Sequence, residues 1–156
     1  IDDTYNSSPL ACACAIKALK DVREPSTSQK IAVLGDMNEL GKDSVAEHKK
    51  IGELCHPEDI EWVVTVGAQA KKYIATAAKA NGCQVRSFDN ALQAGVFVRS
   101  IMEADAVILF KGSQGGIYLE EAVKFVLLDD DDESKLVRQS LEWMAKKQQF
   151  FSKFSN

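Results

Sequence analysis

Residues 31–35 read Ile-Ala-Val-Leu-Gly (IAVLG), a continuous apolar run that ends in glycine. A strand with one face in water alternates apolar and polar residues, whereas an unbroken apolar run is typical of a strand buried on both faces. Two further stretches, 62–67 (WVVTVG) and 106–112 (AVILFKG), are also dominated by apolar residues and also end in glycine. These three runs predict the interior strands of a sheet that is covered on both sides.

Segments with helical patterns alternate with these strands. Ser8 and Pro9 supply an N-cap and a first-turn proline, and the apolar residues after them recur at helical spacing. We expect helices over residues 10–22, 44–55, 68–81, 89–103 (with Asp89 as N-cap), 117–127 and 135–151, a shorter strand over 83–88, a polar loop over 23–30 and a strand end over 1–4. This alternation predicts an α/β fold, a three-layer Rossmann-like sandwich with a mostly parallel sheet.

Three polar loops follow predicted strands: DDTYNSS (2–8), GDMNELG (35–41) and KGSQGG (111–116). Right-handed crossovers between parallel strands place all strand-to-helix loops at the same edge of the sheet. Ligands of open α/β sheets bind outside the carboxyl ends of the strands. We therefore expect the three loops to converge on one rim and to carry the function.

Composition excludes several classes of function. A net charge of −4 over 156 residues gives no basic footprint for nucleic acid, and no apolar run is long enough to cross a bilayer. The four cysteines lack zinc-binding spacing, and the acidic run 129–133 lacks the spacing and the glycine of an EF-hand. We expect no metal site in this chain and cysteines packed as reduced thiols.

The three loops, taken in order, resemble the C-terminal domain of the Mur ligases. That family carries D-D-x-Y-N-x-N-P, then G-D-M-x-E-L-G with a downstream histidine, then V-G, then K-G-S-R. The corresponding stretches here are DDTYNSSP (2–9), GDMNELG (35–41) with His48, VG (66–67) and KGSQ (111–114). The resemblance covers roughly residues 1–128.

The resemblance implies the third domain of a three-domain enzyme. Residues 1–128 would form that domain, and residues 129–156 an acidic hinge followed by an amphipathic helix and an aromatic tail. The N-terminal domain and the central ATPase domain would be absent from this chain, which has no G-x-x-G-K-[ST] phosphate loop. Alone, the chain is expected to be inactive.

Within the family, the motifs are most similar to the ligase that joins D-alanyl-D-alanine to UDP-N-acetylmuramoyl-tripeptide in peptidoglycan precursor synthesis. The resemblance implies ATP-dependent, ADP-forming amide synthesis through an acyl phosphate. ATP and Mg²⁺ would be bound mainly by the missing central domain. It further implies a cytoplasmic monomer whose partners are those two substrates, without nucleic acid and without membrane insertion.

For the nucleotide, the resemblance implies three residues of the first loop. Asp3 would accept hydrogen bonds from the ATP ribose hydroxyls, Asn6 would lie near the phosphates, and Tyr5 would pack on the nucleotide or support the loop. The alternative is an acidic turn that caps the next helix.

For the amino substrate, the resemblance points to the other two loops. Asp36 and Glu39 would orient the incoming amine or a magnesium-bound phosphate, or would only stabilise their own loop. Lys111 and Ser113, with the backbone N–H groups of KGSQGG, would suit a dipeptide carboxylate, or would form a glycine-rich turn with an exposed lysine. His48 is a weaker candidate, because a lone helical histidine is more often structural.

Two positions depart from the family pattern. Ser8 replaces the second asparagine of Y-N-x-N, and Gln114 replaces the arginine after K-G-S. Gln114 would also contact substrate, so its identity leaves open a related ligase with another amino substrate. A non-catalytic α/β binding module is the remaining alternative.

Overall fold

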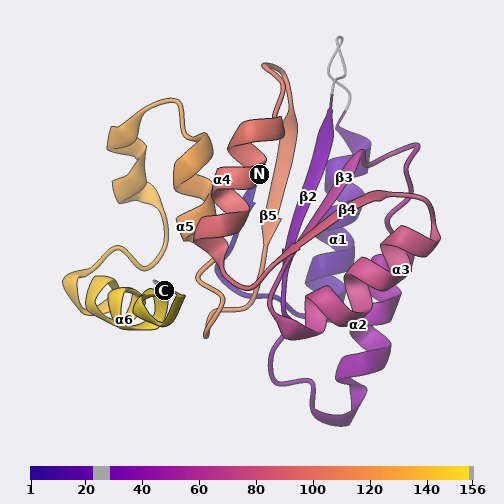
Figure 1. The fold of residues 1–156 in the computed structure, drawn as a ribbon, viewed down its shortest axis with the longest axis horizontal. Helices are drawn as coiled ribbons and strands as arrows, with labels where there is room; N and C mark the ends of the chain where they lie inside the picture. The colour runs from indigo at the N-terminus through magenta and orange to yellow at the C-terminus, as the bar shows by residue number, and fades with distance from the viewer. Residues whose placement is uncertain (23–28, 155–156) are drawn as a thin grey trace.

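A five-stranded, all-parallel sheet lies at the centre of the computed structural model, which describes residues 1–22 and 29–154 (Figure 1). The strands are arranged in the order β1-β5-β2-β3-β4. Their bounds are β1 Asp2–Asp3, β2 Lys30–Gly35, β3 Trp62–Val66, β4 Gln84–Phe88 and β5 Val107–Lys111. The central strand β2 pairs with β3 on one side and β5 on the other. This position explains why IAVLG contains no polar residue, and it confirms the predicted sheet.

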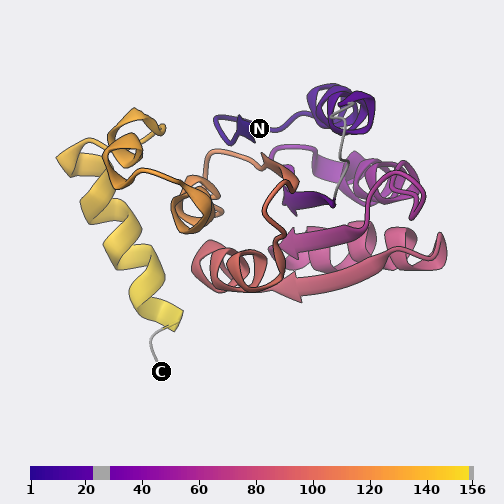
Figure 2. The same ribbon diagram turned by 90° about the horizontal axis from the view of Figure 1, so that it is seen from above.

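Helices cover both faces of the sheet, which confirms the three-layer prediction. One face carries α1 (Pro9–Asp21), α2 (Ser44–Glu53) and α3 (Ala75–Ala80), the last preceded by a π-helical turn η2 (Ala70–Ile74). The other face carries α4 (Ala91–Ile101), α5 (Glu120–Val123) and the 3₁₀ turn η3 (Lys124–Val126). The remaining helices are η1 (Gly41–Asp43), η4 (Asp130–Lys135), α6 (Leu141–Phe151) and η5 (Ser152–Phe154). In both views α6 lies beyond α5, at the side of the molecule away from α1, α2 and α3 (Figures 1 and 2).

Each face has its own apolar core. Leu19 of α1 and Ile74 of η2 are fully buried in the first core, and Val98 of α4 and Leu119 before α5 are fully buried in the second. Burying one such side chain stabilises the fold by about 1.5–3 kcal/mol. The two cores therefore hold the strand ends, and the loops that follow them, in fixed positions.

The predicted start of α1 is confirmed. Ser8 Oγ accepts a hydrogen bond from Ala11 N at 3.3 Å, and Pro9 is the first helical residue. The polar loop predicted over residues 23–30 lies largely outside the described residues.

Two predicted helix starts were wrong. The N-cap of α4 is Asn90, whose Oδ1 accepts from Gln93 N at 3.0 Å, whereas Asp89 pairs with Lys71. The helix predicted from residue 117 begins only at Glu120, because Tyr118 has a φ of 48°, in the left-handed region.

The last helix also begins later than predicted, at Leu141 instead of residue 135. Arg138 interrupts the pattern with a φ of 58°, and Ser140 then caps α6. The expected apolar side of this helix does not form the contact face, since Leu141 is 91% exposed. The face turned toward the domain carries Lys147 and Phe150. The centroid of the Phe150 ring lies 5.2 Å from that of the Tyr118 ring.

Candidate functional site

The three polar loops meet at the carboxyl edge of the sheet, as predicted. Ser113 is the joint between two of them: its Oγ accepts from Asn38 N at 2.8 Å, and its backbone N–H donates to Asp36 O at 3.2 Å. The Asn38 side-chain amide donates to Gly115 O at 2.7 Å. The loop after β2 and the loop after β5 therefore form one hydrogen-bonded unit.

Lys111 connects this unit to the first loop. Its side chain is only 2% exposed, and its ammonium lies 3.0 Å from Asp3 Oδ2. The same nitrogen donates to the backbone carbonyls of Asp3, at 3.4 Å, and of Asn6. The alternative of a turn with an exposed lysine was wrong. The three donors of this ammonium hold the first loop, so its charge is directed at residues 3–6.

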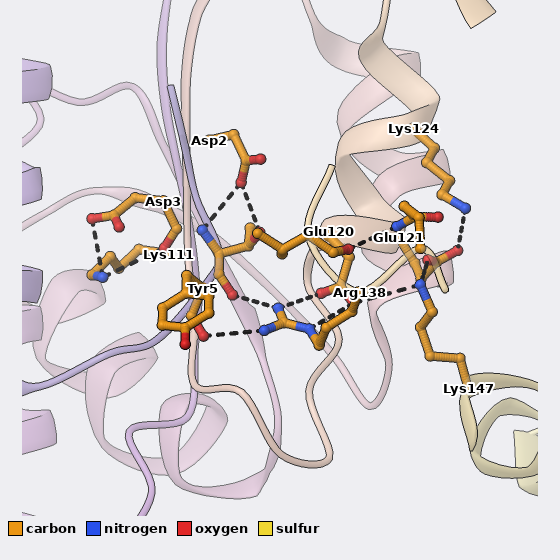
Figure 3. A network of polar contacts seen from close by, with 12 residues as sticks. Asp2, Asp3, Tyr5, Lys111, Glu120, Glu121, Lys124, Arg138 and Lys147 are labelled. Carbon is orange, nitrogen blue, oxygen red and sulfur yellow. Dashed lines mark hydrogen bonds and ion pairs between the residues drawn. The ribbon is translucent and has the colours of Figure 1, made fainter. Parts of the chain in front are cut away.

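The nucleotide candidates lie on the outer side of that loop. Tyr5 is 65% exposed and the Asp3 carboxylate is partly exposed, so both can meet a ligand. Figure 3 shows Asp3 beside Lys111, with Tyr5 near Arg138. Asn6 Oδ1 accepts from Ser7 N at 2.8 Å. The loop acids do not cap α1: Asp2 accepts from the Thr4 backbone and hydroxyl, at 3.1 and 2.7 Å. The capping alternative for this acidic turn was therefore wrong.

Cys12 lies in α1 beneath the first loop. Burial raises the pKa of its thiol to about 12, and the smaller opposing effects of Lys111 and Ser7 do not offset this. The thiol is therefore protonated at neutral pH, as expected of a cysteine that packs as a small apolar residue.

Asp36 connects the turn after β2 (residues 35–37, the GDM turn) to the turn at the end of β3 (residues 66–67, the VG turn). Its Oδ1 accepts from Ala70 N at 2.6 Å, at the start of the helical segment that η2 opens. Gly67 has a φ of 103°, and a Cβ there would lie 2.6 Å from the Asp36 carboxylate. The valine-glycine pair therefore leaves the space that this carboxylate fills, and one of its oxygens is engaged in holding the rim.

His48 supports the same turn from below. It is fully buried in α2, and its Nε2 accepts from Met37 N at 2.9 Å. Its Nδ1 lies 2.7 Å from Ser44 O, which fixes the tautomer with the proton on Nδ1. These contacts make His48 a support for the GDM turn.

A cavity of about 420 Å³ opens where the loops meet. Its lining combines residues of all three loops with residues of the C-terminal segment: Asn6, Asn38, Glu39, Ser113, Gln114, Gly115, Tyr118, Trp143 and Lys146. Four sequence candidates, Asn6, Glu39, Ser113 and Gln114, are thus brought together. Asp3, Tyr5, Asp36, His48 and Lys111 are not in this lining.

The sequence analysis missed one wall of the cavity. The Trp143 ring lies 6.4 Å from the ring of Tyr118, and Lys146 Nζ lies 4.7 Å above the Trp143 ring. Lys146 also pairs with Glu142 at 2.6 Å. The available signal was Trp143 and Lys146 three residues apart in a polar helix, a spacing that puts both side chains on one face.

The described residues contain no group of three or more His, Cys, Asp or Glu side chains that could hold a metal ion. The carboxylates at the rim are also engaged with protein donors, Asp3 with Lys111 and Asp36 with Ala70. Within residues 1–22 and 29–154, these side chains therefore do not form a magnesium site of their own.

Comparison with known proteins identifies the family. Residues 1–114 match the family described as Mur ligase, glutamate ligase domain. The chain belongs to the Mur ligase family. The matched residues of this Mur ligase domain include the first two loops and the first four residues of the third, because the match ends at Gln114.

Two curated relatives of this Mur ligase domain carry the name UDP-N-acetylmuramoyl-tripeptide--D-alanyl-D-alanine ligase. The protein of Bacillus subtilis (strain 168) is 34% identical over 129 residues, which are 80% of this chain and 27% of that protein. The protein of Mycobacterium tuberculosis (strain ATCC 25618 / H37Rv) is 41% identical over 69 residues, 43% of this chain and 14% of that protein. The chain thus spans about a quarter or less of these relatives.

Solved structures support the Mur ligase fold. MurF ligase from Thermotoga maritima, in complex with ADP, matches with a TM-score of 0.63 and 22% identity over 86% of this chain and 28% of that one. MurF from Acinetobacter baumannii matches with a TM-score of 0.64 and 23% identity over 87% of this chain and 28% of that one. At such identities the likeness establishes the fold.

Proposed function

We propose that this chain is the C-terminal domain of an ATP-dependent, ADP-forming ligase that joins D-alanyl-D-alanine to UDP-N-acetylmuramoyl-tripeptide. The observation that carries the proposal is the convergence of the three Mur ligase loops around one cavity, in a chain whose curated relatives bear that ligase's name. Residues 1–128 are the domain proper and residues 129–156 its C-terminal extension. The N-terminal and central domains lie elsewhere in the protein, and this domain alone is inactive.

The proposed reaction has two steps. The γ-phosphoryl group of ATP moves to the tripeptide carboxylate, which gives an acyl phosphate and ADP. The dipeptide amine then attacks the acyl carbon and loses a proton, and phosphate leaves. Such chemistry depends on positioning and on neutralising phosphate charge more than on a protein nucleophile.

In this scheme the rim has two ends. The first loop (residues 2–8) is the nucleotide end, and the cavity is the amine end, where the dipeptide binds. Asp3 accepts from the ribose hydroxyls, Tyr5 packs beside the nucleotide and Asn6 faces the phosphates, while Lys111 holds all three in place. Mg²⁺ is held with the phosphates by the central domain.

The cavity takes the dipeptide at the amine end. Glu39 lies on the wall suited to the dipeptide amine, and Lys146, Ser113 and Gln114 offer donors for its carboxylate. Asp36 acts through the loop it holds. Closure of the domain over bound nucleotide would exclude water from the acyl phosphate.

The proposed setting is a cytoplasmic monomer without a nucleic-acid partner and without membrane insertion. Within the two described ranges, no helix has the length and apolar character needed to cross a bilayer.

The test is phosphate release by the full-length protein with ATP, Mg²⁺ and UDP-N-acetylmuramoyl-tripeptide across a panel of amines and dipeptides. The proposal predicts release that depends on D-alanyl-D-alanine. Release with a different amine would keep the ligase and change its substrate, as the glutamine at position 114 allows. No release with any amine from folded protein would favour a binding module.

A further inference from the structure

Arg138 of the C-terminal extension contacts the first loop of the rim (Figure 3). Its guanidinium donates from Nη2 to Thr4 O at 2.6 Å and from Nη1 to Tyr5 O at 3.1 Å. These two carbonyls belong to the loop that carries Asp3 and Asn6. The extension therefore holds the loop from the side opposite to Lys111.

Arg138 is itself held by a buried carboxylate. Glu120 of α5 is fully buried, and it accepts from Arg138 Nε at 2.9 Å and from Nη2 at 2.7 Å. Such a two-pronged pair fixes the plane and the direction of the guanidinium, which lysine cannot reproduce. The loop carbonyls thus meet donors whose position α5 has already set.

The backbone around the rim is consistent with a functional role for this contact. Among the described residues, positive φ outside glycine occurs at Glu39, Tyr118 and Arg138. Glu39 and Tyr118 line the cavity, and Arg138 holds the loop beside it. Strained backbone persists where the surroundings enforce it, and it gathers at functional sites.

A second cation of the extension serves as a comparison. Lys147 of α6 is also buried, and it pairs with Glu121 and lies 3.6 Å from Glu120 Oε1. Both of these carboxylates belong to α5. These two contacts attach the extension to α5, and neither of them involves a residue of the first loop.

We propose that Arg138 is a positioning residue for the nucleotide loop, so that the C-terminal extension is part of the ATP end of the site. The proposal rests on the proposed function for the nature of the ligand. The placement of Thr4 and Tyr5 by Arg138 is independent of that ligand. Because Arg138 already orders the loop, ATP can bind to Asp3 without the loss of free energy that ordering the loop would otherwise require.

The test compares Arg138→Lys, Arg138→Gln and the control Lys147→Gln in the full-length protein. The first readout is backbone hydrogen exchange in the segment that spans residues 2–8, measured without substrate. Arg138→Lys keeps a charge beside Glu120, so it preserves the fold if Arg138→Gln does not. We expect exchange in the segment to rise about tenfold in Arg138→Lys and to stay at the wild-type rate in Lys147→Gln.

The second readout is the steady-state KM for ATP, set against kcat. Arg138→Lys should raise KM about tenfold with kcat largely kept, as expected when a binding loop loses its order. Wild-type exchange in Arg138→Lys, or an equal rise in Lys147→Gln, would overturn the proposal. An inactive wild-type protein would contradict the proposed function. The hydrogen-exchange comparison would still test whether Arg138 orders the first loop.

Discussion

The buried ammonium of Lys111 lies 3.0 Å from the carboxylate of Asp3, at the point where the edge strand β1 meets β5. Asp3 is the last residue of β1 and Lys111 the last residue of β5, and the two are register partners, so this pair joins the first loop to the loop after β5. The lysine has low exposure and three acceptors, whereas the aspartate remains partly open to solvent. This asymmetry supports the proposal that Lys111 holds the loop and that Asp3 contacts the ligand.

Replacing Lys111 by methionine should release the first loop. The change leaves the partly buried carbonyls of Asp3 and Asn6 without this donor, which costs at most about 1–3 kcal/mol for each of them. We expect a lower free energy of unfolding in urea and a kcat/KM for ATP reduced about tenfold or more. Lys71→Met, which removes only an exposed pair with Asp89, is the control and should change neither. Equal effects of the two variants would contradict the role of Lys111.

Replacing His48 by phenylalanine should destabilise the GDM turn. Met37 N would lose its acceptor while remaining buried, and we expect a loss of about 1–3 kcal/mol in the free energy of unfolding. The chain has one other histidine, the half-buried His56, so His56→Phe provides a matched control. Unchanged stability in His48→Phe would show that the contact with Met37 carries no weight.

The buried thiols predict a loss of stability at high pH. Burial raises the pKa of Cys12 and of Cys55 from 9.0 to about 12. Below pH 9 both thiols are neutral in the folded and unfolded states. Above it the unfolded chain releases their protons first, so stability falls as pH rises from about 9 to about 12. Each thiol contributes up to about 1.4 kcal/mol per pH unit.

The measurement is the urea midpoint from pH 8 to 11 in wild type and in Cys12→Ala/Cys55→Ala. The wild type should lose stability more steeply than the double variant, because only it carries the two thiols. Parallel curves would contradict the burial of the thiols. Cys14, which is exposed, is the control: Cys14→Ala should follow the wild-type curve.

Replacing Gln114 by arginine should strengthen binding at the amine end of the cavity. An added guanidinium can pair with the dipeptide carboxylate in two-pronged fashion, so the KM for D-alanyl-D-alanine should fall about threefold to tenfold. The KM for ATP should change less, because only Asn6 of the three nucleotide candidates lies in the cavity lining. Gln114→Glu should shift the dipeptide KM in the opposite direction. A change confined to the KM for ATP would show that the dipeptide does not bind in this cavity.

The sheet and its rim were predictable because their causes are local or topological. An unbroken apolar run such as IAVLG allows few positions other than the middle of a covered sheet. Parallel connections then bring the following loops to one edge wherever the helices lie. The cap of α1 was equally readable, since Ser8-Pro9 acts within one turn.

The direction of individual side chains could not be read in this way. Lys111 follows a strand into a polar loop, where an exposed position is equally compatible with the sequence. Arg138 breaks the last helical pattern because its partners are 18, 133 and 134 residues away, at Glu120, Tyr5 and Thr4. Such long-range contacts override local propensity. The Trp143 and Lys146 wall of the cavity depends on them, so it was not predicted from the sequence.

The central claim is that the loop held by Lys111 presents Asp3 to the ribose of ATP. The measurement compares ATP with 2′,3′-dideoxy-ATP as substrates of the full-length wild type, of Asp3→Asn and of Asp59→Asn. Asp59 is a matched control, because its carboxylate also lies 3.0 Å from a lysine, Lys20, and is exposed to a similar degree.

If Asp3 accepts from the ribose hydroxyls, the wild type and Asp59→Asn should prefer ATP by about tenfold or more in kcat/KM, and Asp3→Asn should lose most of that preference. If Asp3→Asn keeps the full preference for ATP, the ribose is bound elsewhere and the central claim is wrong.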